Sequence, residues 1–74
     1  MNKNEYPMDE ASLTAMKRIC QAIAAAGYDP YSQLVGYLTT GDDAYITRQG
    51  KARSSIASIK KKHIQIYMNQ YYRR

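Results

Sequence analysis

The chain has 74 residues, a single cysteine and a net charge of +5 at pH 7. One cysteine excludes an intramolecular disulfide, and one cysteine with one histidine supplies too few ligands for a structural zinc site. A domain of this size buries only about 60% of the surface that its unfolded chain exposes, so its core is marginal. Because self-association is then the usual remaining source of stability, we predict a homodimer.

Charge is divided unevenly along the chain. The first 43 residues contain all six acids and three bases, a net charge of −3, whereas the remaining residues contain eight bases and no acid. Such asymmetry is typical of proteins that bind an anionic partner, including nucleic acid. It also suits two copies that pair head to tail.

No apolar run is long enough to cross a bilayer, and the first residues lack the apolar core of a signal peptide. A single cysteine suits a reducing compartment, so we predict a cytoplasmic protein without membrane insertion. Residues 1–8 show no hydrophobic period and are expected to form a mobile N-terminal arm. Residues 9–74 then form a single α-helical domain.

Residues 9–26 are predicted to form the first helix. Its apolar stripe consists of side chains at three- and four-residue spacing, Leu13, Met16, Cys20 and Ile23. Asp9 or Ser12 can cap the start of this helix, and Gly27 is a typical residue just beyond a helix end.

Residues 30–39 are predicted to form a short second helix. Asp29 as N-cap, with Pro30 at the first helical position, is a strong start signal, and Gly41 ends the helix. Its buried side is expected to comprise Tyr31, Leu34, Val35 and Leu38. Gly36 inside this helix costs roughly 1 kcal/mol relative to alanine, which indicates that another backbone approaches it closely.

Residues 41–46 are predicted to form a turn and a short extended segment, followed by a third and longest helix from about residue 49 or 51 to 71. One seam of this helix alternates four- and three-residue steps: Ala52, Ile56, Ile59, His63, Ile66 and Gln70. Further apolar residues widen the surface: Ile64, Tyr67, Met68 and Tyr71. The fold class is therefore all-α with three helices, and the wide apolar surface again favours a homodimer.

No catalytic constellation stands out, and we predict no catalytic, cofactor or metal site. Cys20 lies on an apolar stripe, where cysteine behaves as a small hydrophobe. His63 has no nearby acid in sequence to orient it as a base. Asp42 and Asp43 are neighbours in a turn, where acids usually cap or solvate the turn.

A basic surface is predicted from Lys51, Lys60, Lys61 and Lys62. At about 100° per residue, three consecutive lysines on a helix point in different directions and cannot all face one DNA groove. Contacts of Arg48, Lys51 and Arg53 with phosphate need only positive charge. A small basic nucleic-acid-binding module therefore remains the alternative function.

Residues 27–53 carry a pattern that reads G-Y-[ND]-P-x-x-Q-[IL]-V-G-Y, then G-D-x-A-Y-[IV], then R and A-R. The pattern resembles the signature of the IreB family, small regulatory phosphoproteins of Gram-positive bacteria. The matching positions are Gly27, Tyr28, Asp29, Pro30, Gln33, Leu34, Val35, Gly36, Tyr37, Gly41, Asp42, Ala44, Tyr45, Ile46, Arg48, Ala52 and Arg53.

This resemblance implies a helical homodimer without enzymatic activity that acts through protein–protein contacts. It implies a substrate of a membrane Ser/Thr kinase with PASTA repeats, in envelope-stress or antibiotic-tolerance signalling. The family's phospho-acceptor threonines lie in the N-terminal arm, but residues 1–11 here contain no Ser or Thr. Ser12 and Thr14 are therefore the candidate phospho-acceptors. The family's third helix carries an acidic cluster where this chain has Lys60–His63, which marks a divergent member.

The signature residues are expected to act in structure or at an interface. Gly27, Gly36 and Gly41 would serve backbone geometry. The tyrosines at positions 28, 37 and 45 would supply buried area with polar tips. Asp42 and Arg48 would pair with each other or across the dimer.

Overall fold

The computed structural model describes residues 9–72, which are helical throughout their regular elements and contain no strand. The elements in chain order are α1 (Glu10–Ala25), α2 (Pro30–Thr40), the 3₁₀ turns η1 (Asp43–Tyr45) and η2 (Gln49–Lys51), α3 (Ala52–Ile56) and α4 (Lys61–Tyr71). The all-α prediction is confirmed, but the count of three helices is wrong. The predicted arm at residues 1–8 lies outside the described residues, as do residues 73–74.

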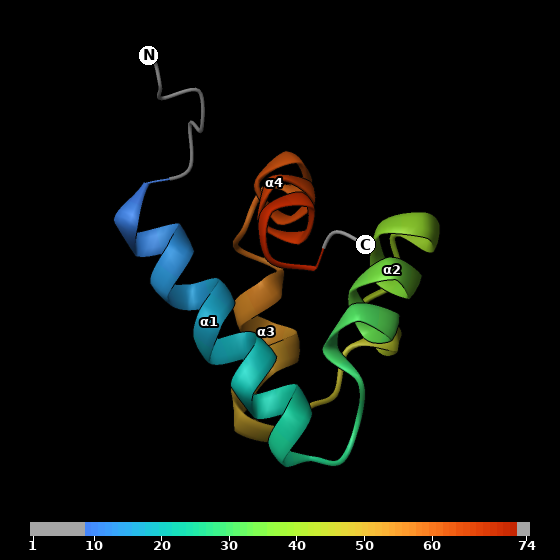
Figure 1. Ribbon diagram of the computed structural model, residues 1–74. Helices are drawn as coiled ribbons and strands as arrows, with labels where there is room; N and C mark the ends of the chain where they lie inside the picture. Colours follow the sequence, from blue (N-terminus) through green and yellow to red (C-terminus); the bar gives the residue numbers. More distant parts are fainter. Residues whose placement is uncertain (1–8, 73–74) are drawn as a thin grey trace.

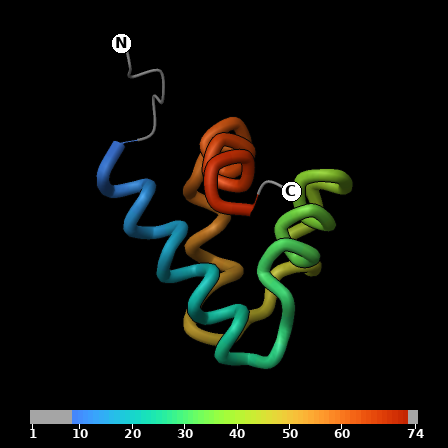
Figure 2. The backbone as a smooth tube through the Cα atoms, viewed as in Figure 1, coloured from blue at the N-terminus to red at the C-terminus, as the bar shows by residue number. Residues whose placement is uncertain are grey.

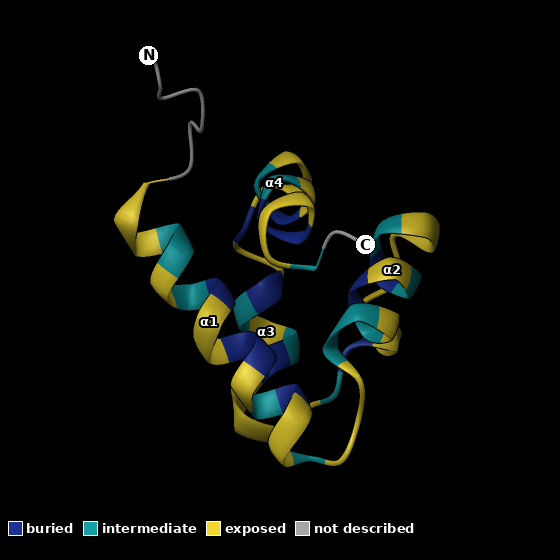
Figure 3. Cartoon of the chain, in the orientation of Figure 1, coloured by how far each residue is buried: buried dark blue, intermediate teal, exposed yellow. Residues whose placement is uncertain are grey.

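The helices surround one core. Figure 1 shows α1 and α2 as the two arms of a V that meet at the bend after α1, with α3 beside α1 and α4 between the open ends. The same path is visible in the backbone tube of Figure 2. Inward faces are buried and outward faces exposed, as Figure 3 shows. The core consists of Met16, Ile19, Cys20, Ile23, Leu34, Tyr37, Ile46, Ala52, Ile56, Ile59, Ile64, Tyr67 and Met68.

The starts of α1 and α2 are capped as predicted. Asp9 Oδ1 accepts a hydrogen bond from Ser12 N–H at 2.9 Å. Asp29 Oδ2 accepts from both the backbone N–H of Ser32 at 3.1 Å and its hydroxyl at 2.9 Å. These bonds satisfy N–H groups that have no partner within the helix. Gly41 ends α2 with a φ of 75°, in the left-handed region that glycine adopts without strain.

The predicted third helix is interrupted between α3 and α4. Residues 57–60 form a turn in which Ser58 N–H and Ile59 N–H donate three residues back, to Ser55 and Ile56 carbonyls. The Ser58 hydroxyl also donates to the Ser55 carbonyl at 2.8 Å. Serine side chains compete in this way with the helical hydrogen bonds of the backbone, so a serine-rich stretch favours a turn.

This interruption changes which residues of α4 are buried. The expected seam continued through His63, Ile66 and Gln70, but His63 and Ile66 are half-buried and Gln70 is exposed. The core side of α4 instead carries Ile64, Tyr67 and Met68. Three- and four-residue spacing identifies one face only within a continuous helix. After the turn, α4 begins with a new orientation, so spacing counted from α3 no longer identifies the side that faces the core. The predicted seam is therefore wrong beyond Ile59.

The segment between α2 and α3 is not the predicted extended piece. Residues 43–45 form the 3₁₀ turn η1, and extended backbone angles occur at its flanks, Asp42 and Ile46. In η2, Gly50 and Lys51 both have positive φ, 59° and 60°. A Cβ at Gly50 would lie 2.7 Å from the Cβ of Ala22, so η2 packs directly against α1 at this glycine.

We predict that Gly50→Ala destabilises the protein more than Gly27→Ala does. Both glycines have positive φ, but nothing lies within 4 Å of a Cβ at Gly27. Gly27→Ala should cost about 1 kcal/mol from backbone strain alone, and Gly50→Ala roughly 1–3 kcal/mol more from overpacking against Ala22. Urea unfolding followed by circular dichroism measures both values. Equal losses for the two variants would contradict the proposed contact.

Candidate functional site

Two side chains of the signature hold the segment between α2 and α3. Gln33 Oε1 accepts a hydrogen bond from the backbone N–H of Thr47 at 2.9 Å. Arg53 donates from Nε to the Ile46 carbonyl at 2.9 Å and from Nη2 to the Ala44 carbonyl at 3.4 Å. The turn is therefore anchored to α2 on one side and to α3 on the other, although neither role was foreseen from the sequence.

The close approach predicted at Gly36 exists, but its partner is a side chain. A Cβ built on Gly36 would lie 2.6 Å from Tyr45 Cδ1 and 2.9 Å from Tyr45 Cγ. The ring of Tyr45 therefore packs on the surface of α2 where a larger residue would displace it. The expectation of an approaching backbone was wrong, because η1 rather than another helix crosses Gly36.

The three signature tyrosines have different environments. Tyr37 is buried in the core, as predicted, but Tyr28 is 54% exposed and Tyr45 is 50% exposed. Tyr28 lies just before the N-cap of α2, outside the helical stripe that faces the core. Tyr45 covers Gly36 with part of its ring and leaves the rest exposed. The prediction of burial is therefore wrong for these two residues.

Asp42 caps the η1 turn rather than pairing with Arg48. Its Oδ1 accepts from the Ala44 N–H at 2.9 Å, and its own N–H donates to Thr40 Oγ1 at 3.0 Å. Arg48 is exposed and makes no side-chain cap of η2. Within residues 9–72 Asp42 and Arg48 form no ion pair, and the Asp42 carboxylate accepts the Ala44 N–H instead.

A surface hollow of about 660 Å³ lies beside this turn. It is lined by Tyr28, Ser32, Gln33, Ala44, Tyr45, Ile46, Thr47, Arg48, Gln49 and Arg53. The lining combines two arginines and two half-exposed tyrosines and contains no acidic residue. Tyr28 and Arg48, two exposed residues of the signature, thus line the same surface hollow.

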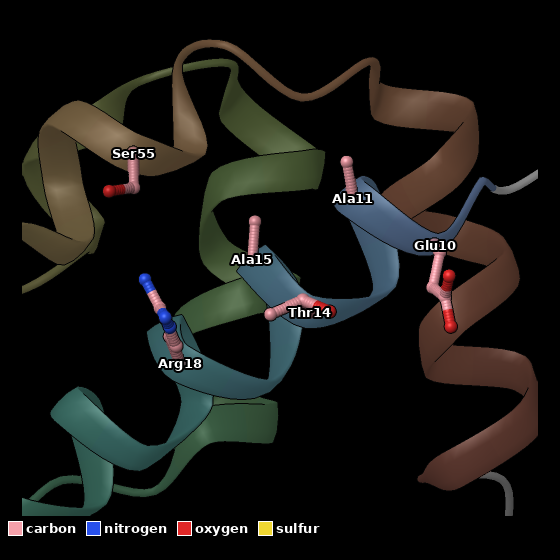
Figure 4. A pocket seen from close by; sticks show the side chains of 6 residues that line it. All are labelled: Glu10, Ala11, Thr14, Ala15, Arg18 and Ser55. Carbon is pink, nitrogen blue, oxygen red and sulfur yellow. The ribbon is translucent and has the colours of Figure 1, made fainter.

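One of the two candidate phospho-acceptors, Thr14, lines a second hollow, of about 510 Å³, between α1 and α3. Figure 4 shows the Arg18 side chain extending toward Ser55, with Thr14 one turn earlier at the edge of the hollow. Ser12 has a different environment. Hydrogen bonds from its side chain and then its backbone N–H lower the pKa of the Asp9 carboxyl. Thr14 is therefore the more open of the two hydroxyl groups.

The predicted basic residues do not form one face. The Lys61 ammonium lies over the Tyr37 ring, 5.5 Å from its centroid, which places its stem against α2. Lys60 precedes α4 as its N-cap, and Lys62 is exposed in the first turn. Lys51 lies in η2 and lines a third, smaller hollow with Arg48 and Arg53. Lys61 therefore makes a cation–π contact with α2 rather than contributing to a shared basic face.

Cys20 lies in the core and is 6% exposed. Burial raises the pKa of its thiol, which disfavours the thiolate that nucleophilic chemistry requires. Burial likewise raises the pKa of the neighbouring Tyr67 to about 12. In the part of the chain that the structure describes, no group of three His, Cys, Asp or Glu residues could hold a metal ion. Nor is any described helix long and apolar enough to span a membrane.

The geometry is that of a small helical protein with one apolar core and several surface hollows. Comparison with known families assigns the chain more specifically. Residues 2–73 match the family described as IreB regulatory phosphoprotein, which covers nearly the whole chain. The protein belongs to the IreB family, and the resemblance recognised in residues 27–53 is confirmed.

The contact between Gly36 and Tyr45 predicts that Gly36→Ala changes the free energy of unfolding in opposite directions when the Tyr45 ring is present and when it is removed. Gly36→Ala should destabilise the protein by about 1 kcal/mol, because displacement of the ring outweighs the better helix propensity of alanine. In a Tyr45→Ser protein the same change should stabilise it by about 1 kcal/mol, since only the propensity remains. Urea midpoints of the four proteins complete the double-mutant cycle. The same effect of Gly36→Ala in both backgrounds would refute the contact.

Proposed function

We propose that this protein is a non-enzymatic cytoplasmic regulator that acts as a homodimer through protein contacts. Membership of a family of regulatory phosphoproteins carries this proposal. The surface supports it, because exposed tyrosines and arginines beside η1 are typical of protein interfaces.

The homodimer is supported by apolar side chains that the single chain leaves exposed. Val35 was expected on the buried side of α2, but that side carries Leu34 and Tyr37, and Val35 is 36% exposed. Tyr71 on α4 is 47% exposed. Covering such groups with a second copy would add apolar burial to a core that is small.

Light scattering should therefore give a mass near twice 8.5 kDa. The value should be the same at low and high salt, because apolar contacts are screened far less than surface ion pairs. A folded monomer at both salt concentrations would contradict the dimer. Dissociation at high salt alone would instead favour pairing of the acidic and basic regions.

The family also suggests regulation by a membrane Ser/Thr kinase with PASTA repeats, and we propose Thr14 as the acceptor. Phosphorylation adds nearly two negative charges. At Thr14 these charges would lie one helical turn from Arg18. At Ser12 they would face the Asp9 carboxylate that already accepts hydrogen bonds from this residue. Glu10, one turn before Thr14, lines the same hollow, so Thr14 lies between one acid and one base, whereas Ser12 is hydrogen-bonded to the Asp9 carboxylate. This balance of charges favours Thr14.

This proposal is tested with the purified kinase domain of a PASTA-type enzyme, ATP and the full chain. Mass spectrometry should locate the phosphate on Thr14. Thr14→Val should remove the phosphorylation, whereas the matched Ser12→Ala should retain it. Phosphorylation of Ser12 with Thr14 unmodified would refute the choice of site, and no phosphorylation of either would refute regulation of this chain through α1.

A basic nucleic-acid-binding module is the second candidate, favoured by the proximity of Arg48, Lys51 and Arg53 around one hollow. A salt-dependent affinity for duplex DNA would support it, and no binding at low salt would exclude it. The position of Lys61 over Tyr37 weighs against a continuous basic face that follows the phosphate backbone.

A further inference from the structure

The hollow beside η1 has the composition of a receptor for a negatively charged chain. We propose that it binds an acidic segment of a partner protein, with carboxylates on Arg48 and Arg53 and apolar atoms against Tyr28 and Tyr45. We call this surface the arginine groove and define it by these four residues, which line the hollow together. This inference rests on the proposed function, since it states the chemistry of a protein partner.

Arg53 is held in place by neutral groups. Its Nε and Nη2 donate to the carbonyls of Ile46 and Ala44. Guanidinium has five N–H donors, so most of its donor capacity remains for another acceptor. Within residues 9–72 Arg53 is half-buried and forms no ion pair with a carboxylate, although Asp43 lines a neighbouring hollow with it. An arginine oriented in this way loses little side-chain freedom when it binds a carboxylate.

The surroundings reinforce this positive charge. Arg48 is exposed and lines the same hollow, whose described lining contains no acid. One acid lies close by: Asp43 lines an adjacent hollow together with Arg48, Lys51 and Arg53. One carboxylate among three cations leaves the charge of this surface positive. Two arginines on one concave surface attract and orient an anionic segment.

The two tyrosines give the groove an apolar surface, which a simple anion cannot cover. Tyr28 and Tyr45 are 54% and 50% exposed and border the arginines. Tyrosine contributes a large apolar surface with a polar tip and is enriched at protein interfaces. An acidic peptide presents carboxylates and apolar side chains together and therefore satisfies both parts of the groove. Free phosphate would engage the arginines alone.

Nucleic acid fits this surface less well. The groove is a local hollow of about 660 Å³, the size of a site for a few residues of an extended peptide. Binding to duplex backbone depends instead on many cations that follow successive phosphates. Lys51 lies beside the groove in the adjacent hollow, but Lys61 is directed toward the Tyr37 ring, so the bases do not form the continuous track that a duplex backbone requires.

The experiment uses the full ¹⁵N-labelled protein, titrated with a short peptide of alternating Glu and Leu while amide shifts are followed. The same peptide with Gln in place of Glu is the ligand control. The acidic peptide should shift the amides of Tyr28, Tyr45, Arg48 and Arg53 with a Kd on the order of 1 mM or tighter. Arg48→Gln should weaken binding about tenfold, because a charge-assisted contact is lost.

Lys62→Gln is the matched protein variant, since it removes the same charge from an exposed residue outside the groove. It should change the affinity by less than about twofold, as expected for a screened distant charge. Arg48→Gln should keep the fold because Arg48 is exposed and makes no side-chain cap, and circular dichroism checks this. Tyr28→Ser provides a second, uncharged test of the groove.

Several outcomes would overturn the inference. These are no shifts in the groove, equal binding of the Gln peptide, equal weakening by Lys62→Gln, or tighter binding of a single-stranded RNA at the same amides. A fall in dimer mass on Tyr28→Ser would assign the groove to the second copy and overturn it as well. With the wild-type dimer mass and Thr14 phosphorylation intact, failure of peptide binding would reject the groove alone.

Discussion

The turn between α2 and α3 depends on insertion of Ile46 into the core. Its side chain is fully buried while its carbonyl accepts a hydrogen bond from Arg53 Nε. Burial of an isoleucine contributes on the order of 2 kcal/mol, but burial of an unpaired carbonyl would offset much of this. Arg53 and Gln33 therefore make insertion of the turn favourable. The position of Tyr45 on Gly36 and the shape of the arginine groove both follow from this anchoring.

The local parts of the fold could be predicted because their causes lie within a few residues. Asp29 and Pro30 start α2, and Gly41 ends it, through contacts that span one helical turn. The interruption between α3 and α4 also has a local cause, but the prediction of one continuous helix relied on apolar spacing alone and missed it. Apolar spacing continues through the serine-rich stretch, whereas the hydrogen bond from the Ser58 hydroxyl that stabilises the turn leaves no mark on hydrophobic periodicity.

The candidate site was only partly predictable. The signature indicated which residues matter, but the contact of Gln33 with Thr47 spans 14 positions and depends on the path of the turn. Tyr28, Tyr37 and Tyr45 are the same amino acid in the same signature, yet only Tyr37 is buried. Exposure is decided by the direction of each side chain relative to the core. That direction follows from η1 and from the bend after α1, which periodicity does not describe.

The start of α4 shows that tertiary packing can outweigh unfavourable local electrostatics. Lys60, Lys61 and Lys62 lie at the N-terminus of this helix, where the helix dipole disfavours positive charge, and Lys60 provides no side-chain cap. The helix is held instead by burial of Ile64, Tyr67 and Met68. Placement of Lys61 over Tyr37 moves one charge away from the terminal N–H groups toward α2.

The short helix α3 connects the two surfaces considered for regulation. Arg53 and Ser55 both belong to this five-residue helix. Arg53 anchors η1 and lines the arginine groove, whereas Ser55 faces Arg18 across the hollow beside Thr14. Because so short a helix moves as a unit, a displacement of α3 relative to α1 would shift both residues together. The packing of Gly50 against Ala22, just before α3, limits such a displacement. The two surfaces therefore share one element, α3, and its position against α1 is fixed by the packing at Gly50.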